Sequence, residues 1–573
     1  MRLGLAALLS LLVISGCDSG GGGDDASTDG DSDADGDGDG DADGDGDADS
    51  DGDADSDGDA DSDGDGDVDA DSDADGDGPE PTHRRYEPME IELTSSVTYD
   101  NPYTEVTLEA EVTPPEGSGE TPYTIPGFWD GGDTFRVRWA PRSAGHYEVR
   151  TVCSDEANTG LHGQEFELDV NDRISDTWAP HGFIEVDPES EHYFRRNDGT
   201  PMLWVGDTIW TAIYEQGWYD PVFTDDLWRE LCDRRAEYGY TVLQPVVWNG
   251  SERWSDGVRP FGGSDGTDHD RIDPESWQRL DERIEYAVQQ GLLVYLLISS
   301  NGQHFEWPED QRTRLQRYLV ARYAAYNVAF GGGEEVDRGG WGSDAKYTQF
   351  IDTYHDLDPY RRLVALHAGG TGGTALAIDE VDFFIAQDTD PTFAESLDRS
   401  RNNGIPYVVG ETGYFDTDRN HGTSDPVELR RWTWTIFLGG AAGYTAGHAG
   451  VCVVGSCSHP DEYRSSDLTD ESADEIRSAA RFLTRPDVHY WTWTRFEDLG
   501  NGRTLSADPG TEYVILSRSE GAFTVDLSDA SGTLEGVWYD IDAGAEAGTV
   551  SVEAGSSVEI SPPGSWHVLL LTP

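Results

Sequence analysis

The sequence predicts a multidomain protein whose centre is a (β/α)8 TIM barrel. Short apolar runs alternate with helical patterns from about residue 178 to residue 486, and this alternation is typical of a buried parallel sheet. Eight repeats over a stretch of about 300 residues fit a closed barrel. Polar or aromatic residues follow the apolar runs, and the chain on both sides of this region changes to alternating, strand-like patterns.

The eight apolar runs are expected to form the barrel strands, because each is short and is bounded by Gly, Pro or polar residues. Their ranges are 202–206, 241–247, 292–298, 327–333, 363–366, 383–386, 407–410 and 441–445. Helical patterns lie between several of them, at 224–238, 274–290, 309–323, 345–356 and 427–438. This order predicts parallel strands whose carboxyl ends share one face of the barrel, where such folds build their active sites.

The regions that flank the barrel read as β-structure. Residues 84–172 contain runs in which polar and apolar residues alternate, separated by Pro141 and Gly145, and they predict an N-terminal immunoglobulin-like β-sandwich. Residues 488–573 return to the same kind of pattern and predict a small C-terminal β-sandwich. The C-terminal region contains no cluster of residues of catalytic type, and the N-terminal region is expected to pack on the neighbouring domain or to contact glycan.

The first 82 residues are expected to export and tether the protein. An apolar run ends in Ile14-Ser15-Gly16-Cys17, so we expect residues 1–17 to be a lipoprotein signal peptide with acylation at Cys17. Residues 18–82 are rich in Asp and Gly; such a segment cannot bury apolar surface and is expected to be a disordered tether. We therefore expect an exported bacterial lipoprotein that is anchored to a membrane and faces the periplasm or the cell surface.

Charge and cysteine usage exclude several classes of partner. The formal net charge is −76, which argues against nucleic acid because phosphates require Lys and Arg. Cys452 and Cys457 are close in sequence in a protein expected to be exported, so a disulfide between them is expected. Cys153 and Cys232 are expected to be buried thiols. No Cys/His spacing resembles a zinc site, and we expect no metal and no cofactor.

Two strand ends carry the residues that cleavage of a glycosidic bond requires. Glu334 and Glu335 follow the fourth expected strand, and Glu411 follows the seventh. Glycoside hydrolysis uses one carboxylic acid to protonate the leaving oxygen and a second carboxylate as nucleophile or base. Glu411 suits the role of nucleophile, and either Glu335 or Glu334 suits the role of acid/base.

Other strand-end residues are candidates for binding sugar. They are Asp207, Trp210, Trp248, Asn249, His304, His367, Gln387, Tyr414 and His448. Each has a structural alternative: Asp207 could cap the following helix, and the aromatic and histidine side chains could be barrel packing. The histidines also suggest a metal-dependent hydrolase, but such barrels commonly take a His-x-His pair from the first strand, where this chain has Gly206-Asp207-Thr208.

These motifs together resemble the apiosidase-like glycoside hydrolases related to family 140. The matching segments are 206–210, 321–328, the Gly-rich run that ends at Glu335, 410–414 and 439–444. The resemblance implies a strand-four acid/base at Glu335, a strand-seven nucleophile at Glu411 and retention of configuration. It also implies a β-sandwich before the barrel, around 127–131, and a collagen-binding-type domain after it. Here the strand-four motif reads Phe330-Gly331-Gly332-Gly333-Glu334, a departure that leaves Glu334 and Glu335 open as the acid.

We therefore expect a surface-anchored, retaining glycoside hydrolase that acts as a monomer on a polysaccharide, with pectic polysaccharide as one substrate class that the resemblance implies. The alternative is a non-catalytic glycan-binding or adhesion lipoprotein with a degenerate barrel. The distance between the carboxyl groups of Glu335 and Glu411 distinguishes the two, because a separation above about 10 Å would favour binding over catalysis.

Overall fold

The computed structural model describes most of the chain after the expected tether. It covers residues 83–210, 212–216, 222–248, 250, 252–388, 390, 392–415, 422–448 and 471–573, all within one compact unit that spans Asp77–Pro573. The expected signal peptide, the tether, Cys17, Asn249, Cys452 and Cys457 lie outside these residues.

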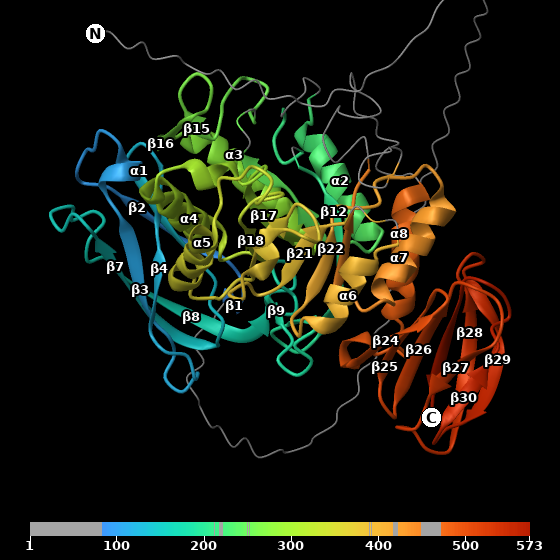
Figure 1. Cartoon of the computed structure of the whole chain (residues 1–573). Coiled ribbons are helices and arrows are strands. Elements are labelled where there is room, and N and C mark those ends of the chain that lie inside the picture. Colours follow the sequence, from blue (N-terminus) through green and yellow to red (C-terminus); the bar gives the residue numbers. More distant parts are fainter. Residues whose placement is uncertain are drawn as a thin grey trace, which may run out of the picture. The chain divides into compact units, whose positions relative to one another are not determined.

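A nearly closed barrel of parallel strands occupies the centre of this unit (Figure 1). Its strands are β12 (Trp204–Thr208), β13 (Val242–Gln244), β14 (Val246–Trp248), β17 (Leu293–Ser299), β18 (Val328–Gly331), β19 (Val364–Ala365), β20 (His367–Ala368), β21 (Phe384–Gln387), β22 (Tyr407–Gly410) and β23 (Gly443–Ala446). They follow the order β19-β18-β17-β13-β12-β23-β22-β21-β20, with β14 also paired to β17. Each of the eight predicted apolar runs overlaps one of these strands, the second run overlaps both β13 and β14, and β20 begins one residue after the fifth run.

The sheet comes close to closure at the fifth predicted strand. There β19 pairs with β18, whereas β20 pairs with β21. Only Leu366 separates β19 from β20, so one short stretch of chain joins the two ends of the sheet. The second predicted strand is divided in the same way, at Pro245, because proline has no N–H to donate to a ladder.

Helices lie between the strands, close to their predicted ranges. They are α2 (Asp225–Glu237), α3 (Pro274–Gln289), α4 (Glu309–Tyr323), α5 (Asp344–Leu357), α6 (Ala394–Asn402), α7 (Pro426–Phe437) and α8 (Glu471–Leu483). Capping residues explain several starts: Thr224 accepts a hydrogen bond at the beginning of α2, and Asp273 and Asp425 do so before Pro274 and Pro426. The sequence patterns did not predict α6 and α8.

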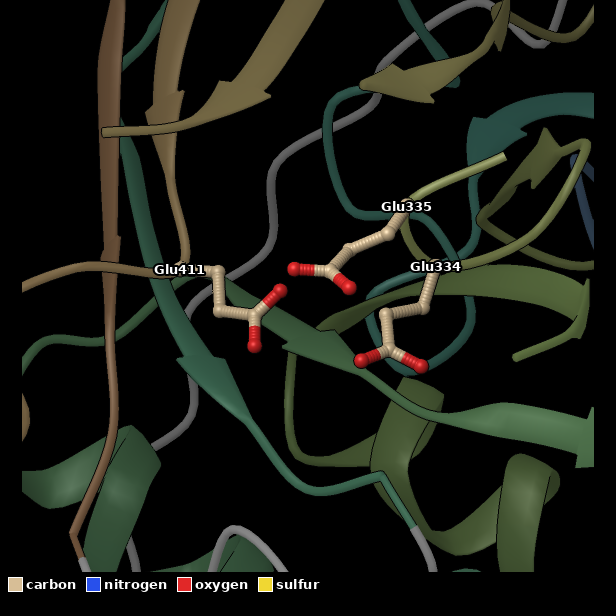
Figure 2. A group of neighbouring side chains, drawn as sticks. All are labelled: Glu334, Glu335 and Glu411. Atoms are coloured by element: carbon tan, nitrogen blue, oxygen red, sulfur yellow. The ribbon is translucent and has the colours of Figure 1, made fainter. Parts of the chain in front are cut away.

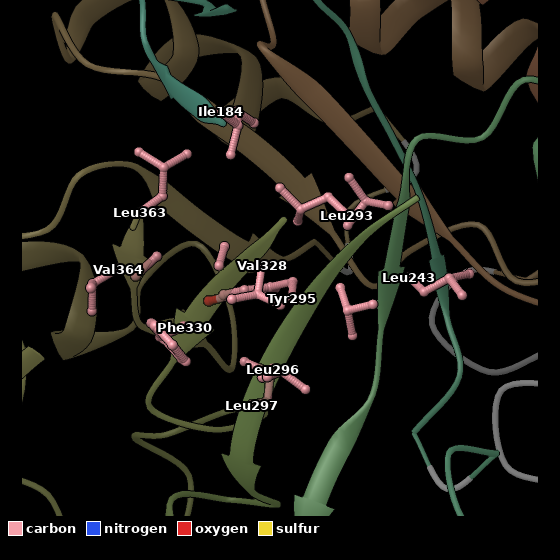
Figure 3. Close-up of a cluster of buried hydrophobic side chains, with 14 of the residues drawn as sticks. Ile184, Leu243, Leu293, Tyr295, Leu296, Leu297, Val328, Phe330, Leu363 and Val364 are labelled. Atoms are coloured by element: carbon pink, nitrogen blue, oxygen red, sulfur yellow. The ribbon is translucent and has the colours of Figure 1, made fainter. Parts of the chain in front are cut away.

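Large apolar side chains are buried around the barrel strands, which explains why the strands read as continuous apolar runs. Figure 3 shows part of this core, where Leu243, Leu293 and Val328 come from three successive strands of the sheet. Every residue of β17 is buried. A parallel sheet that is covered on both faces requires such a sequence.

The N-terminal region contains two antiparallel sheets. One has the order β1-β8-β7-β3-β4 and the other β2-β6-β5. Their strands are β1 (His83–Arg85), β2 (Met89–Thr94), β3 (Leu108–Thr113), β4 (Tyr123–Pro126), β5 (Phe128–Gly131), β6 (Thr134–Trp139), β7 (Gly145–Cys153) and β8 (Glu165–Ile174), with the single-turn helix α1 (Pro102–Glu105) after β2. The only departure from antiparallel pairing is β1, which runs parallel to β8.

Among the described residues, two small sheets and three 3₁₀ turns accompany these larger parts. A three-stranded sheet of β9 (Ile184–Val186), β10 (Phe194–Arg196) and β11 (Pro201–Met202) precedes the barrel, and β15 (Phe261–Gly262) pairs with β16 (Asp268–Ile272) after the second barrel strand. The turns are η1 (Gln303–Glu306), η2 (Thr374–Ala377) and η5 (Tyr490–Thr492). The sequence analysis assigned none of them.

A buried group of charges joins the N-terminal sheets to the barrel helices. Asp281 of α3 accepts hydrogen bonds at 2.8 Å from Arg138 of β6 and from Arg322 of α4. Arg322 also reaches Asp130 of β5 at 2.9 Å. A buried charge without a partner is costly in free energy. The arginines and aspartates must therefore stay paired, and this pairing fixes how β5 and β6 pack on α3 and α4.

The C-terminal region is also built from two antiparallel sheets. Six strands follow the order β24-β25-β26-β31-β28-β29, and β27 pairs with β30. The bounds are β24 (Arg495–Gly500), β25 (Arg503–Asp508), β26 (Glu512–Ser517), β27 (Phe523–Asp526), β28 (Thr533–Asp540), β29 (Ala545–Glu553), β30 (Ser557–Ile560) and β31 (His567–Thr572). A second apolar core, which includes Tyr513 and Leu534, lies in this region.

Two further expectations can be compared with the described residues. Cys153 and Cys232 are buried free thiols, as predicted. In the part of the chain that the structure describes, no helix combines the length and the apolar character needed to cross a bilayer.

Candidate active site

Three glutamates meet at the carboxyl ends of two barrel strands. Glu334 and Glu335 follow β18, and Glu411 follows β22 directly. One carboxylate oxygen from each lies within 4.8 Å of the others, and Figure 2 shows the side chains of Glu335 and Glu411 pointing toward each other from opposite sides, with Glu334 beside them. All three are buried. The strand order therefore brings together residues that are more than seventy positions apart in sequence.

Both Glu335 and Glu411 have left-handed backbone conformations. Their φ angles are 44° and 51°, in a region that side chains other than Gly, Asn and Asp rarely adopt. Each such residue costs about 1–2 kcal/mol. Strain of this kind concentrates at functional sites, where the surrounding structure holds a side chain in one required direction.

Two glycines allow the chain to approach its neighbours closely at these strand ends. A Cβ atom at Gly333 would lie 2.2 Å from the carbonyl oxygen of Ser299 in β17. A Cβ atom at Gly410 would lie 2.7 Å from the Ile385 side chain and 3.2 Å from Nε2 of His367. Glycine is therefore required immediately before each glutamate segment so that the carboxylates can reach the same point.

His367 of β20 contacts both glutamate segments. Its Nδ1 accepts a hydrogen bond from the main-chain N–H of Glu335 at 3.1 Å, and its Nε2 lies 3.7 Å from Oε2 of Glu411. Burial lowers the pKa of His367 to about 3, so the ring is neutral. Because Nδ1 accepts, the ring proton is assigned to Nε2 and points toward Glu411.

Tyr414 and Trp210 form a second set of contacts to Glu411. The indole N–H of Trp210 donates to the hydroxyl of Tyr414 at 3.2 Å, and a hydrogen bond between Tyr414 and Glu411 lowers the pKa of that carboxyl. With its oxygen accepting from Trp210, the tyrosine hydroxyl is oriented to donate to Glu411. Trp210 also packs edge-on against the ring of His367, 5.9 Å away.

Arg338 and Gln387 lie on the Glu335 side of the site. Arg338 is half exposed and forms an ion pair with Glu335 at 3.0 Å, and it also donates a hydrogen bond to the side-chain oxygen of Gln387. A hollow of about 390 Å³, lined by Asp337, Arg338 and a glycine-rich segment at 369–373, opens at this point.

Burial raises the pKa of all three glutamates, and repulsion by neighbouring carboxylates adds to it for Glu335 and Glu411. Burial is the largest cause in each case. For Glu335 the pKa rises to about 8, with the charge of Glu334 adding to the effect of burial and Arg338 opposing it. For Glu411 the pKa lies well above its usual value because of burial and the charges of Glu334 and Glu335. Carboxylates this close cannot all be ionised, so the cluster keeps protons at neutral pH.

The structure gives other partners to several predicted sugar-binding residues. Asp207 lies within β12 and accepts a hydrogen bond from Arg235 at 2.6 Å, both side chains being buried; the cap of α2 is Thr224, so the capping alternative for Asp207 is wrong. Trp248 donates to the carbonyl oxygen of Gly266 at 3.3 Å, and His304 bonds to the Ser299 hydroxyl at 2.7 Å. His448 packs against Phe415. For these residues, contact with substrate stays a prediction.

Sequence reasoning missed Arg338 and the left-handed backbone of the two glutamates. Arg338 follows Glu335 by three residues. This spacing would have predicted their contact only if a turn had been expected at these residues. The backbone conformation has no composition signal, because glutamate rarely adopts it.

Comparison with known protein families decides the assignment. The model of the apiosidase-like catalytic domain matches residues 188–491, which is more than half of the chain and includes all three glutamates. The chain belongs to the apiosidase-like family. The resemblance predicted from the sequence is thus confirmed. A second model, the domain of unknown function DUF5060, matches residues 82–154, within the N-terminal sheets.

Solved structures share the fold of this apiosidase-like protein. A candidate glycoside hydrolase from Bacteroides vulgatus ATCC 8482 superposes with a TM-score of 0.67 and 19% identity, covering 85% of this chain and 99% of its own. A glycoside hydrolase family 5 structure from the same organism gives a TM-score of 0.55 and 17% identity, covering 70% and 95%. No curated protein matches the sequence. At these identities the similarity supports the fold, and the family assignment supports glycoside hydrolysis.

Proposed function

We propose that this protein hydrolyses glycosidic bonds with retention of configuration, with Glu411 as nucleophile and Glu335 as acid/base. The observation that carries the proposal is the approach of their carboxylates, with oxygens less than 4.8 Å apart. Retaining enzymes hold the two carboxyl groups about 5–5.5 Å apart, whereas inverting enzymes need about 6.5–9.5 Å to admit a water molecule. The barrel itself we interpret as (β/α)8, with β13 and β14, and likewise β19 and β20, each counted as one interrupted strand.

In the first step Glu411 attacks the anomeric carbon while Glu335 protonates the leaving oxygen, and a glycosyl ester forms on Glu411. In the second step the ionised Glu335 takes a proton from a water molecule. The oxygen of that water attacks the anomeric carbon, and the ester bond between the sugar and Glu411 breaks. The raised pKa of Glu335, about 8, suits an acid that must be protonated near neutral pH.

The contacts around each carboxyl group favour this division of roles. Burial and the charges of Glu334 and Glu335 raise the pKa of Glu411, and Arg338 and the hydrogen bond from Tyr414 oppose this rise by favouring the ionised form that a nucleophile needs. Glu335 has Glu334 as a neighbour, whose charge favours the protonated form. Arg338 acts in the opposite direction on Glu335, but its half-exposed position lets solvent screen it.

The proposed substrate is a polysaccharide, and the proposed location of the enzyme is a membrane surface. A polysaccharide, with pectic polymers as one class, would approach through the hollow beside Arg338. Acylation at Cys17 would attach the enzyme to a membrane through residues 18–82. Labelling of the protein with a fatty-acid analogue in a bacterial host, and loss of that label in Cys17→Ala, would test the anchor.

Hydrolysis of a panel of aryl glycosides and of pectic and hemicellulosic polysaccharides tests the reaction. With a substrate in hand, Glu411→Gln should lose most activity while the protein stays folded, and the first product released should keep its anomeric configuration by NMR. Glu282→Gln, on the exposed side of α3, is the matched control. Full activity of Glu411→Gln would eliminate this assignment.

A non-catalytic glycan-binding protein is the alternative function. The short distance between Glu335 and Glu411 argues against it, since a degenerate site has no reason to keep three buried carboxyl groups whose charges repel. Saturable binding of a polysaccharide without turnover of any aryl glycoside would support this alternative.

A further inference from the structure

Glu334 is the one member of the carboxylate cluster to which the two-carboxylate mechanism assigns no task. It lies in the same buried cluster as Glu335 and Glu411. Its main-chain N–H donates to the carbonyl oxygen of Ser299 at 2.9 Å, and it forms an isolated parallel bridge with Ser300. The backbone therefore extends the β18–β17 pairing by one step before Glu335 turns away, and this fixes the Glu334 side chain inside the barrel mouth.

Burial raises the pKa of Glu334, and the Ser300 side chain and Arg338 oppose this rise only in part. The Oε2 atom of Glu334 is buried and has no hydrogen-bond partner among the described residues. Arg338 is the one cation whose ion pair with the cluster is described, and it contacts Glu335. His367, the other basic side chain at the site, is neutral. A structural role alone would be served at lower cost by an amide or an apolar side chain.

Taken with the functional proposal above, on which this inference rests, the geometry points to Glu334 as a positioning residue that shares protons with Glu335 and Glu411. Its charge opposes the effect of Arg338 on Glu335, so that the acid/base keeps its proton at neutral pH. Three interacting carboxyl groups titrate together, and the limits of the pH–rate profile then belong to the cluster and not to single residues.

Replacement of Glu334 by glutamine removes a titratable group while keeping its shape. Because the like charge disappears, Glu335 and Glu411 should both lose protons more easily. We expect both limbs of the pH–rate profile of kcat/KM to move to lower pH by about one unit in Glu334→Gln. Glu334→Asp, which retains a carboxylate, should restore part of the shift, and Glu282→Gln should give the wild-type profile.

The dependence of the rate on the leaving group distinguishes a positioning role of Glu334 from an acid/base role. If Glu334 were the acid/base, Glu334→Gln would lose activity most strongly on substrates with poor leaving groups, and azide would rescue it through a glycosyl azide product. That result would overturn the inference. A pH–rate profile of Glu334→Gln whose limbs stay at their wild-type pH would also overturn it. A requirement for an added divalent cation, abolished in Glu334→Gln and measured with Ca²⁺ alone by calorimetry, would also overturn it, because the three carboxylates would then be ligands.

A measurement without substrate separates this inference from the proposed function. The thermal midpoints of wild type, Glu334→Gln, Glu335→Gln and the double variant are compared between pH 4.5 and pH 8. Proton sharing predicts that the two substitutions are non-additive at pH 8 and additive at pH 4.5, where the carboxyl groups are protonated. Non-additivity without activity on any glycoside would reject the proposed function alone, whereas additivity at both pH values would reject the role of Glu334.

Discussion

Nδ1 of His367 accepts a hydrogen bond from the main-chain N–H of Glu335, with 3.1 Å between the two nitrogens. The opposite nitrogen of the same ring lies 3.7 Å from Oε2 of Glu411. One neutral imidazole thus touches the segments that carry both proposed catalytic groups. It fixes the turn at which Glu335 leaves β18 and offers its remaining N–H to the nucleophile.

Replacement of His367 by alanine should therefore reduce kcat with little change in KM. Loss of the ring leaves the buried main-chain N–H of Glu335 without its acceptor, which costs about 1–3 kcal/mol and corresponds to a loss of roughly 5–150-fold in rate. Steady-state kinetics on an aryl glycoside would measure it. His355→Asn, a histidine on α5 that pairs with Asp382 away from the cluster, is the control. A His367→Ala variant with the kcat of the control would contradict the role of the ring.

Tyr414→Phe should shift the acidic limb of the pH–rate profile. In the wild type the tyrosine hydrogen bond lowers the pKa of Glu411, so its loss raises that pKa and the nucleophile ionises at higher pH. With 1.5–3 kcal/mol for the bond and 1.36 kcal/mol per pKa unit, we expect a shift of about 1–2 units. Trp210→Phe, which removes the hydrogen bond that orients the Tyr414 hydroxyl, should shift the limb in the same direction by less. An unchanged acidic limb in Tyr414→Phe would show that the hydroxyl does not donate to Glu411.

Glu335→Gln should stabilise the fold at alkaline pH while it removes activity. The folded-state pKa of Glu335 is raised to about 8, above the ordinary value near 4.3 in an unfolded chain. Stability from the protonated group is therefore fully present below about pH 4.3 and is lost as pH rises toward 8.

Glutamine does not titrate, so the thermal midpoint of Glu335→Gln should exceed that of wild type at pH 8 and approach it at pH 4.5. Each kcal/mol added to the free energy of unfolding raises the thermal midpoint by about 2–4 °C in a domain of 150–250 residues. We therefore expect a rise of a few degrees. Calorimetry at the two pH values measures this difference. A midpoint that is lower than wild type at pH 8 would mean that the ion pair with Arg338 outweighs the cost of burial.

The barrel could be predicted from sequence because its strands are buried on both faces. The apolar run at 407–410 and the helical pattern at 309–323 coincide with the bounds of β22 and α4, and no competing pattern occurs there. In contrast, α6 was missed because the segment Ala394–Asn402 is mostly polar, and buries only Ser396, Leu397 and Ser400. Its weak apolar face gives little signal at helical spacing.

The site was predictable to the level of residue type and strand, and no further. That Glu335 and Glu411 would meet follows from the parallel strand order. That His367 contacts both of them depends on the break between β19 and β20 and on the close approach at Gly410, which no local pattern encodes. Asp207 was expected at a strand end, but its partner Arg235 comes from the following helix, a tertiary contact that the sequence does not reveal.

The charged group at the junction of the N-terminal sheets and the barrel gives a last prediction, on stability. Asp281 accepts hydrogen bonds from two buried arginines, Arg138 and Arg322. Asp281→Asn removes the negative charge and leaves both cations without their shared partner. Breaking a buried ion pair costs about 3–5 kcal/mol, so the thermal midpoint at pH 7 should fall clearly. Glu237→Gln, which disrupts an exposed pair with Arg234, should cost no more than about 0.5 kcal/mol.

The pH dependence of this effect identifies its cause. The two arginines lower the pKa of Asp281 in the folded protein, so its contribution is present above the unfolded value near 3.9 and is lost as pH falls through the lower folded value. Wild type and Asp281→Asn should therefore differ most near neutral pH and converge in strong acid. A difference that is constant with pH would instead indicate that Asp281→Asn acts through lost packing at the junction, and not through the charge on Asp281.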